Sequence, residues 1–157
     1  MTAADIKVKD IMMDPILIQE DSTFFDALKL MMERKVNTLL VVDSEGVLVG
    51  EVSVVNLLEA IVPDFVEEDT IAAHYMSQAT FEQEIEEAKD VPVSKFVNKN
   101  RESVEENASL MEVAVVAMDM SQARVPVVNK DKKPVGVVTR RGLKKIVAAH
   151  LGIDWDN

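Results

Sequence analysis

Two short stretches of the chain, 86 positions apart, decide its fold. Residues 49–56 read Val-Gly-Glu-Val-Ser-Val-Val-Asn, and residues 135–142 read Val-Gly-Val-Val-Thr-Arg-Arg-Gly. In each stretch an apolar run with high strand propensity leads into a hydroxyl residue of the kind that opens helices. These residues, Ser53 and Thr139, coincide at this offset. The pattern predicts a strand followed directly by a helix in both places.

The same offset aligns the chain with itself, without a gap, over the whole segment from Val8 to Val62. The matching positions include Lys9 with Lys95, Glu20 with Glu106, Met32 with Met118, Val42 with Val128, and Leu57 with Leu143. Isolated valines can match by chance, but one register held over a whole unit indicates a duplication. The segment 8–62 and its counterpart are therefore interpreted as two copies of one structural unit.

Both copies show the same order of elements: strand, helix, strand, strand, helix. Strands are expected at residues 15–18, 38–42 and 47–52, and again at 102–104, 124–128 and 134–138. The first helix of each copy begins with a hydroxyl residue followed three positions later by a carboxylate, a pair that satisfies free backbone N–H groups. These pairs are Thr23 with Asp26 and Ser109 with Glu112. The last helices are expected from Ser53 to about Val62 and from Thr139 to about Ala149.

A single unit of this length, with one small sheet, cannot close a large core. Two copies packing their sheets together can do so. The sequence therefore predicts an α/β (α+β) fold: two βαββα repeats packed sheet to sheet as one pseudo-two-fold module, with a helical insertion between them. The expected parts are residues 1–62, the first repeat with an N-terminal segment; 63–93, an acidic helical insertion; and 94–157, the second repeat with a C-terminal tail.

Charge is distributed unevenly over a chain whose net charge is −11. Residues 63–93 carry nine acidic residues against Lys89 alone, whereas residues 94–150 carry eleven basic residues against six acidic ones. The overall sign disfavours nucleic acid and anionic membranes as partners. The insertion is interpreted either as a linker helix or as a docking segment for a partner protein or a second subunit.

The residues that catalysis or metal binding would require are not found in a useful pattern. The chain has no cysteine, and its two histidines are far from suitable ligands in sequence. It shows no glycine-rich phosphate loop and no nucleophile motif. No apolar run is long enough for a bilayer, and the first residues do not resemble a secretory signal. We therefore expect a cytoplasmic protein that is not an enzyme and holds neither a metal nor a cofactor.

The two repeats, each ending in apolar-Gly-x-Val-Ser/Thr-x-x-Asn/Asp or a close variant, resemble the CBS domain family. Residues 124–129, Arg-Val-Pro-Val-Val-Asn, are similar to that family's central strand. The resemblance implies a tandem CBS pair, or Bateman module, with two related clefts between the repeats. Such modules commonly bind AMP, ATP or S-adenosylmethionine and regulate an attached or partner protein.

The resemblance also implies roles for particular residues. Ser53 and Thr139 would lie beside ribose or phosphate, and the residue three positions later would hydrogen-bond the ribose hydroxyls. That residue is Asn56 in the first copy, where an amide can still bond a diol. In the second copy it is Gly142, which departs from the family pattern. Backbone groups near the central strands, where Thr38 and Val125 stand, would bind the base. The alternative is that Val125 and Pro126 shape the edge of the sheet.

Basic residues at the second helix start suggest a phosphate site, because a helix N-terminus favours anions. Arg140 and Arg141 follow Thr139. Arg124, at the start of the central strand, is a third basic candidate, and a surface role is its alternative. Consecutive helical residues point in different directions, so we expect at least one of the two arginines to face a ligand phosphate. The alternative is that Thr139 only caps the helix and the arginines are solvated or ion-paired. The first copy offers no such charge, so its cleft suits a neutral or cationic adenosine ligand, or none.

Two functions from different classes fit these observations. The first is a sensor that binds an adenosine-containing nucleotide between the repeats, works as a homodimer and signals to an unidentified effector protein. The second is a ligand-free scaffold whose acidic first repeat pairs with the basic second repeat of another copy.

Overall fold

The computed structural model describes residues 6–63, 70–119 and 124–153. The chain divides into two compact units, each with its own three-stranded sheet. The first unit contains the chain up to Ile16, Gly46–Leu48 and the residues from Asn100 onward; the second contains Leu17–Glu45 and Val49–Lys99. The predicted α+β class and the βαββα order of both repeats are confirmed.

The second unit contains the first repeat of the sequence. Its sheet order is β1-β2-β3, with β1 and β2 parallel. Its repeat consists of β1 (Leu17–Gln19), α2 (Phe24–Arg34), β2 (Thr38–Val42), β3 (Leu48–Ser53) and α3 (Val54–Ile61). Helix α2 begins as predicted, because Thr23 Oγ1 accepts the Asp26 N–H at 3.2 Å and Asp26 Oδ2 accepts the Thr23 N–H at 3.0 Å. The helix buries Phe24, Ala27 and Met31 in the core.

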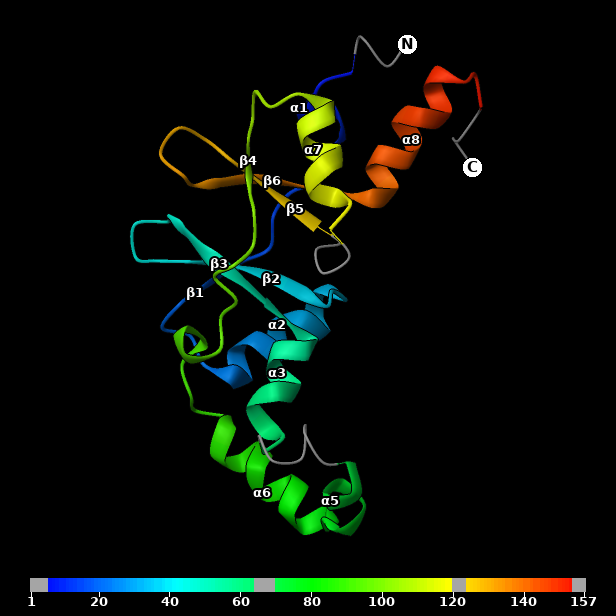
Figure 1. Ribbon diagram of the computed structural model, residues 1–157. Coiled ribbons are helices and arrows are strands. Elements are labelled where there is room, and N and C mark those ends of the chain that lie inside the picture. The colour runs from blue at the N-terminus through cyan, green and yellow to red at the C-terminus, as the bar shows by residue number, and fades with distance from the viewer. Residues whose placement is uncertain (1–5, 64–69, 120–123, 154–157) are drawn as a thin grey trace. The chain divides into compact units, whose positions relative to one another are not determined.

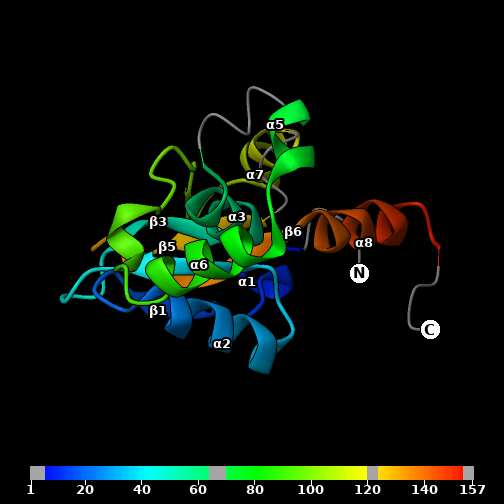
Figure 2. The ribbon, with the colours of Figure 1, turned by 90° about the horizontal axis from the view of Figure 1, so that it is seen from below.

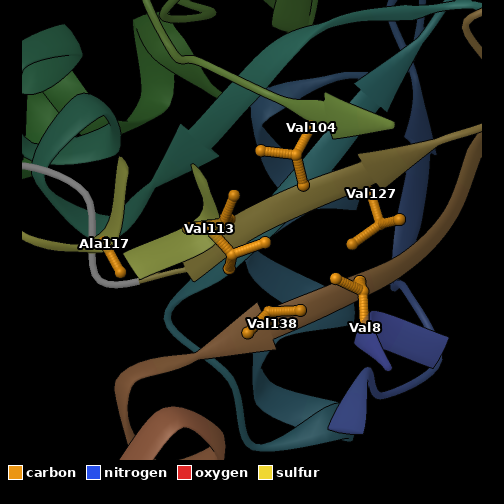
Figure 3. Packing of buried hydrophobic residues seen from close by; sticks show 7 residues of the cluster. Val8, Val104, Val113, Ala117, Val127 and Val138 are labelled. Carbon is orange, nitrogen blue, oxygen red and sulfur yellow. The ribbon is translucent and has the colours of Figure 1, made fainter. Parts of the chain in front are cut away.

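The first unit repeats this plan with the order β4-β5-β6. Its elements are α1 (Val8–Ile11), β4 (Val104–Glu105), α7 (Leu110–Ala117), β5 (Arg124–Val128), β6 (Pro134–Thr139) and α8 (Arg140–His150). Strand β4 is parallel to β5, and β5 is antiparallel to β6. Small aliphatic side chains fill the core, as Figure 3 shows, and they are Val8, Val104, Val113, Ala117, Val125, Val127 and Val138.

The first strand of each repeat begins two residues later than predicted, at Leu17 and at Val104. In the first repeat the predicted start was Pro15, which has no N–H to donate to a ladder. In the second repeat Glu102 and Ser103 are exposed and polar, so burial of the strand begins only at Val104.

Each sheet is completed by the segment that precedes the other repeat. Met13 and Val137 exchange two backbone hydrogen bonds of 2.8 and 2.9 Å, and Glu51 and Asn98 exchange two of 3.0 and 2.8 Å. The repeated glycines explain this approach. A Cβ on Gly136 would lie 2.5 Å from Sδ of Met12, and a Cβ on Gly50 would collide with the carbonyl of Asn98.

Residues 70–95 form the helical part of the segment between the repeats, and they belong to the second unit. They fold into α5 (Thr70–Tyr75), α6 (Gln78–Ala88) and a 3₁₀ turn, η2 (Val93–Lys95). Helix α6 lies against α3 (Figures 1 and 2). Residues 64–69 of the predicted insertion lie outside the described residues.

The residues that follow α6 are bound to the first repeat by main-chain hydrogen bonds. The carbonyl of Val91 accepts the Phe24 N–H at 2.9 Å, and the Val93 N–H donates to the carbonyl of Ser22 at 2.7 Å. On the exposed surface, Lys89 Nζ lies 2.6 Å from Glu86 Oε2. The hydrogen bond that Lys89 Nζ donates to the Glu86 carboxylate raises the pKa of Lys89 above its usual value.

Candidate functional site

In both repeats the last strand delivers a hydroxyl residue to the N-cap of the last helix. Thr139 has extended backbone angles, and its Oγ1 accepts the Gly142 N–H at 3.2 Å. Ser53 Oγ accepts the Asn56 N–H at 3.3 Å. Each hydroxyl therefore caps its helix, as strand-to-helix transitions with this sequence predict. The other N–H groups of each first turn have no acceptor within the helix.

The start of α8 opens onto a cavity of about 570 Å³. From α8 the cavity is lined by Thr139, Arg141, Gly142, Lys145 and Ile146. The opposite wall comes from the N-terminal segment and is formed by Ile6, Asp10, Ile11 and Met13. All of these residues belong to the first unit. The volume is within the range of small-molecule sites, which typically span about 300–1,000 Å³.

Two positive side chains share one face of this cavity. Arg141 and Lys145 are four residues apart on α8, so they lie one turn above each other on the same helix face. Arg141 is exposed and Lys145 is half-buried. Because the helix N-terminus adds a partial positive charge, the α8 wall of the cavity favours a negatively charged group.

Arg140 has a different position and does not line the cavity. Its Nε donates to the carbonyl of Ala117 at 2.9 Å, and its Nη2 donates to the carbonyl of Asp119 at 2.6 Å. Arg140 therefore satisfies carbonyl groups at the C-terminal end of α7, where cations are favourable. The structure thus separates two arginines that are adjacent in sequence.

Three further candidate residues lie on strands and do not line this cavity: Arg124, Val125 and Thr38. Arg124 is half-buried and stands opposite Thr139 in the β5–β6 ladder. The side chain of Val125 is fully buried in the core, so only its backbone could contact a ligand. Thr38 begins β2 in the second unit and is half-buried.

The α3 start differs from the α8 start. Asn56 Oδ1 accepts the Ser53 N–H at 2.9 Å and lies 3.1 Å from Ser53 Oγ, so the two side chains are hydrogen-bonded to each other. Neither residue lines the α8 cavity or the second cavity, of about 250 Å³, formed where α3, α5 and α6 meet. The other residues of the first turn, Val54 and Val55, carry no charge.

Sequence reasoning did not select Asp10 or Lys145, both of which line the α8 cavity. The four-residue spacing from Arg141 was a signal for Lys145. Asp10 had no such signal, because its place depends on α1 (Val8–Ile11) folding with the second repeat. Met13, which forms the bridge to Val137, was missed for the same reason.

Within residues 6–63, 70–119 and 124–153, no three acidic, histidine or cysteine side chains gather closely enough to hold a metal ion. In the same parts of the chain, every helix is too short or too polar to cross a bilayer.

The sequence matches the CBS domain family over residues 8–63 and 88–149. The matched residues make up most of the chain and coincide with the two repeats. The protein therefore belongs to the CBS domain family and contains a tandem CBS pair.

The chain is 28% identical over 134 residues to the carnitine transport ATP-binding protein OpuCA of Listeria monocytogenes, a match covering 85% of this chain and 27% of that protein. The chain thus spans about a quarter of that relative's length.

Two solved structures resemble this fold. One is Arabidopsis thaliana CBSX2 in complex with AMP, with 26% identity, a TM-score of 0.67, and coverage of 93% of this chain and 98% of that chain. The other is a CBS domain-containing protein of unknown function from Kribbella flavida, with 22% identity, a TM-score of 0.75, and coverage of 91% and 99%.

Proposed function

We propose that this protein is a regulatory module that binds an adenosine phosphate at the start of α8. One observation carries the proposal: Thr139, Arg141 and Lys145 converge on a single cavity of about 570 Å³. Membership of the CBS domain family supports it, as does the similarity to CBSX2, which was solved with AMP. The proposed role is regulatory and involves no catalysis, cofactor or metal.

The phosphate is assigned to the α8 wall of the cavity. There the Arg141 guanidinium offers a planar set of donors that matches phosphate oxygens, and Lys145 adds a second positive charge. The free N–H groups of the first turn lie at the N-terminal end of α8, where the helix dipole is positive. The adenine is assigned to the apolar wall of Ile11 and Met13, where a thioether can contact an aromatic ring.

Regulation follows from the two walls of the cavity. One wall is α8, and the other is the N-terminal segment, which is held to β6 by the hydrogen bonds between Met13 and Val137. A ligand that contacts both walls favours the arrangement in which they are docked. We propose that an effector protein, or a part of a longer polypeptide, responds to this change in the cytoplasm.

A second candidate function is assembly into a homodimer. Phe25, Leu28 and Met32 form an exposed apolar row on α2. Met111 and Val115 of α7, with its C-cap residue Met118, form a similar row. Met118 is 77% exposed and Met32 is 72% exposed. Contiguous exposed apolar surface favours association. Light scattering should then give twice the monomer mass for the native chain and the monomer mass for Met32→Glu with Met118→Glu.

The sensor proposal is tested by titrating the native protein with adenosine, AMP, ADP, ATP and S-adenosylmethionine in a calorimeter. At least one phosphorylated compound should bind, and adenosine should bind more weakly, because the α8 wall recognises phosphate. The same compound should raise the melting temperature when present far above its Kd. The proposal fails if none of AMP, ADP and ATP binds at millimolar concentration.

A further inference from the structure

The two repeats differ at the third residue of their last helix. The first repeat carries an amide side chain there, and the second repeat carries none. Asn56 occupies that position in the first repeat, and Gly142 occupies it in the second. Gly142 therefore brings no acceptor to the α8 cavity for the hydroxyl groups of a ribose. A ligand with a vicinal diol needs an acceptor from another element.

Asp10 is the carboxylate that lines this cavity. It lies on α1, next to Ile11, and α1 approaches α8 closely at Gly142. A Cβ on Gly142 would lie 3.5 Å from the carbonyl oxygen of Ile11 and 3.9 Å from the Ile11 Cβ. The missing side chain would thus point toward α1, the element that supplies Asp10.

The carboxylate of Asp10 is held by its own helix. Its Oδ2 accepts the Lys7 N–H at 2.8 Å, as part of the capping box of α1. A carboxylate has two oxygens and several acceptor sites, so this bond leaves capacity for further donors. Two neighbouring hydroxyl groups are suitable donors for such a group, because hydrogen bonds to a charged acceptor are strong.

Charge determines which part of the ligand can face Asp10. Phosphate oxygens are repelled by a carboxylate and attracted by Arg141 and Lys145 on the α8 wall. The neutral, hydroxyl-bearing part of a nucleotide is the part that can approach Asp10 without this repulsion. The two walls together therefore orient a ligand that has an anionic end and a diol.

We propose that Asp10 is the specificity residue that binds the ribose diol in this cavity and replaces the acceptor that Gly142 lacks. This assignment rests on the proposed function, since it presupposes that a nucleotide binds at the start of α8. It predicts that the protein selects ribonucleotides over nucleotides without ribose hydroxyls. The selection arises from α1, outside the second repeat itself.

The test compares AMP with 2′,3′-dideoxy-AMP by calorimetric titration of the native protein and four variants. The native protein should prefer AMP by about tenfold, a value typical of hydrogen bonds to a charged group. Asp10→Ala should lower this preference to about twofold or less. Asp10→Asn retains an oxygen for the Lys7 cap and should give an intermediate preference. Asp14→Ala removes an exposed carboxylate of the same segment that does not line the cavity, and should leave the preference unchanged.

The fourth variant combines Asp10→Ala with Gly142→Asp and tests whether the acceptor can be moved to α8. A Cβ at position 142 would have ordinary contact distances to its neighbours. An Asp carboxylate placed there should restore the preference for AMP. The ratio of the two affinities is measured within each variant, so a general loss of stability does not imitate the result. An unchanged ratio in Asp10→Ala overturns the assignment but leaves the sensor proposal standing. Failure of the native protein to bind either nucleotide overturns both.

Discussion

The last helices of the two repeats, α3 and α8, begin with the same backbone geometry but expose different chemistry. At the start of α3, Ser53 and Asn56 bond to each other and leave no charged side chain in the first turn. At the start of α8, Thr139 caps the helix alone, and Arg141 lies on the wall of a cavity. The duplication has thus preserved the cap and changed the positions that packing does not constrain.

The offset of 86 residues shows where the change occurred. Arg141 corresponds to Val55, and Lys145 corresponds to Glu59. At these two positions α8 therefore carries positive side chains where α3 carries one neutral and one negative side chain. Val55 and Glu59 are exposed, as is Arg141. Exposed positions of this kind can change charge at little cost to folding, since they contribute few core contacts.

The largest expected effect concerns the matched glycines, Gly50 and Gly136. A Cβ at Gly50 would meet the main chain of Asn98, whereas a Cβ at Gly136 would meet the flexible side chain of Met12. We expect Gly50→Ala to destabilise the protein by about 3 kcal/mol and Gly136→Ala by about 1 kcal/mol. Urea denaturation of the two variants measures both values. Equal losses would show that the two crossing segments are not held as described.

A smaller effect is expected at the third position of each helix, and its sign should differ between the repeats. Asn56→Ala removes the acceptor for Ser53 and should cost about 1 kcal/mol. Gly142→Ala adds a Cβ at ordinary contact distance and improves helix propensity, so it should stabilise the protein by about 0.5–1 kcal/mol. Thermal denaturation distinguishes the signs. Destabilisation by Gly142→Ala would mean that the space beside Ile11 is tighter than the structure indicates.

Local features of the fold were predictable from the sequence. The caps at Thr23, Ser53, Ser109 and Thr139 are determined by residues within three positions, and all four are found. The order of strands and helices follows from apolar periodicity, which is also local. The starts of β1 and β4 were placed two residues too early, because propensity alone does not show where burial begins.

Long-range features were not predictable from one sequence. The matched glycines were evident, but their reason is the approach of Met12 and Asn98, which are distant in sequence. For the site, Thr139 and Arg141 were selected, yet their role as ligand residues stays a prediction. Spacing could not tell which of Arg140 and Arg141 lines the cavity, because that depends on the orientation of α8 against its neighbours. Asp10 was missed because α1 folds against the second repeat, which is distant from it in sequence.

The central claim is that nucleotide binds at the start of α8 and not at the start of α3. It is tested most directly by the stoichiometry of AMP in a calorimetric titration of the native chain, of Arg141→Ala with Lys145→Ala, and of Lys144→Ala. Lys144 is an exposed neighbour that does not line the cavity, so its variant controls for the loss of positive charge. We predict one AMP per chain, about a hundredfold loss of affinity in the double variant, and less than a twofold change in the control. Two AMP molecules per chain, or undiminished binding by the double variant, would contradict the account.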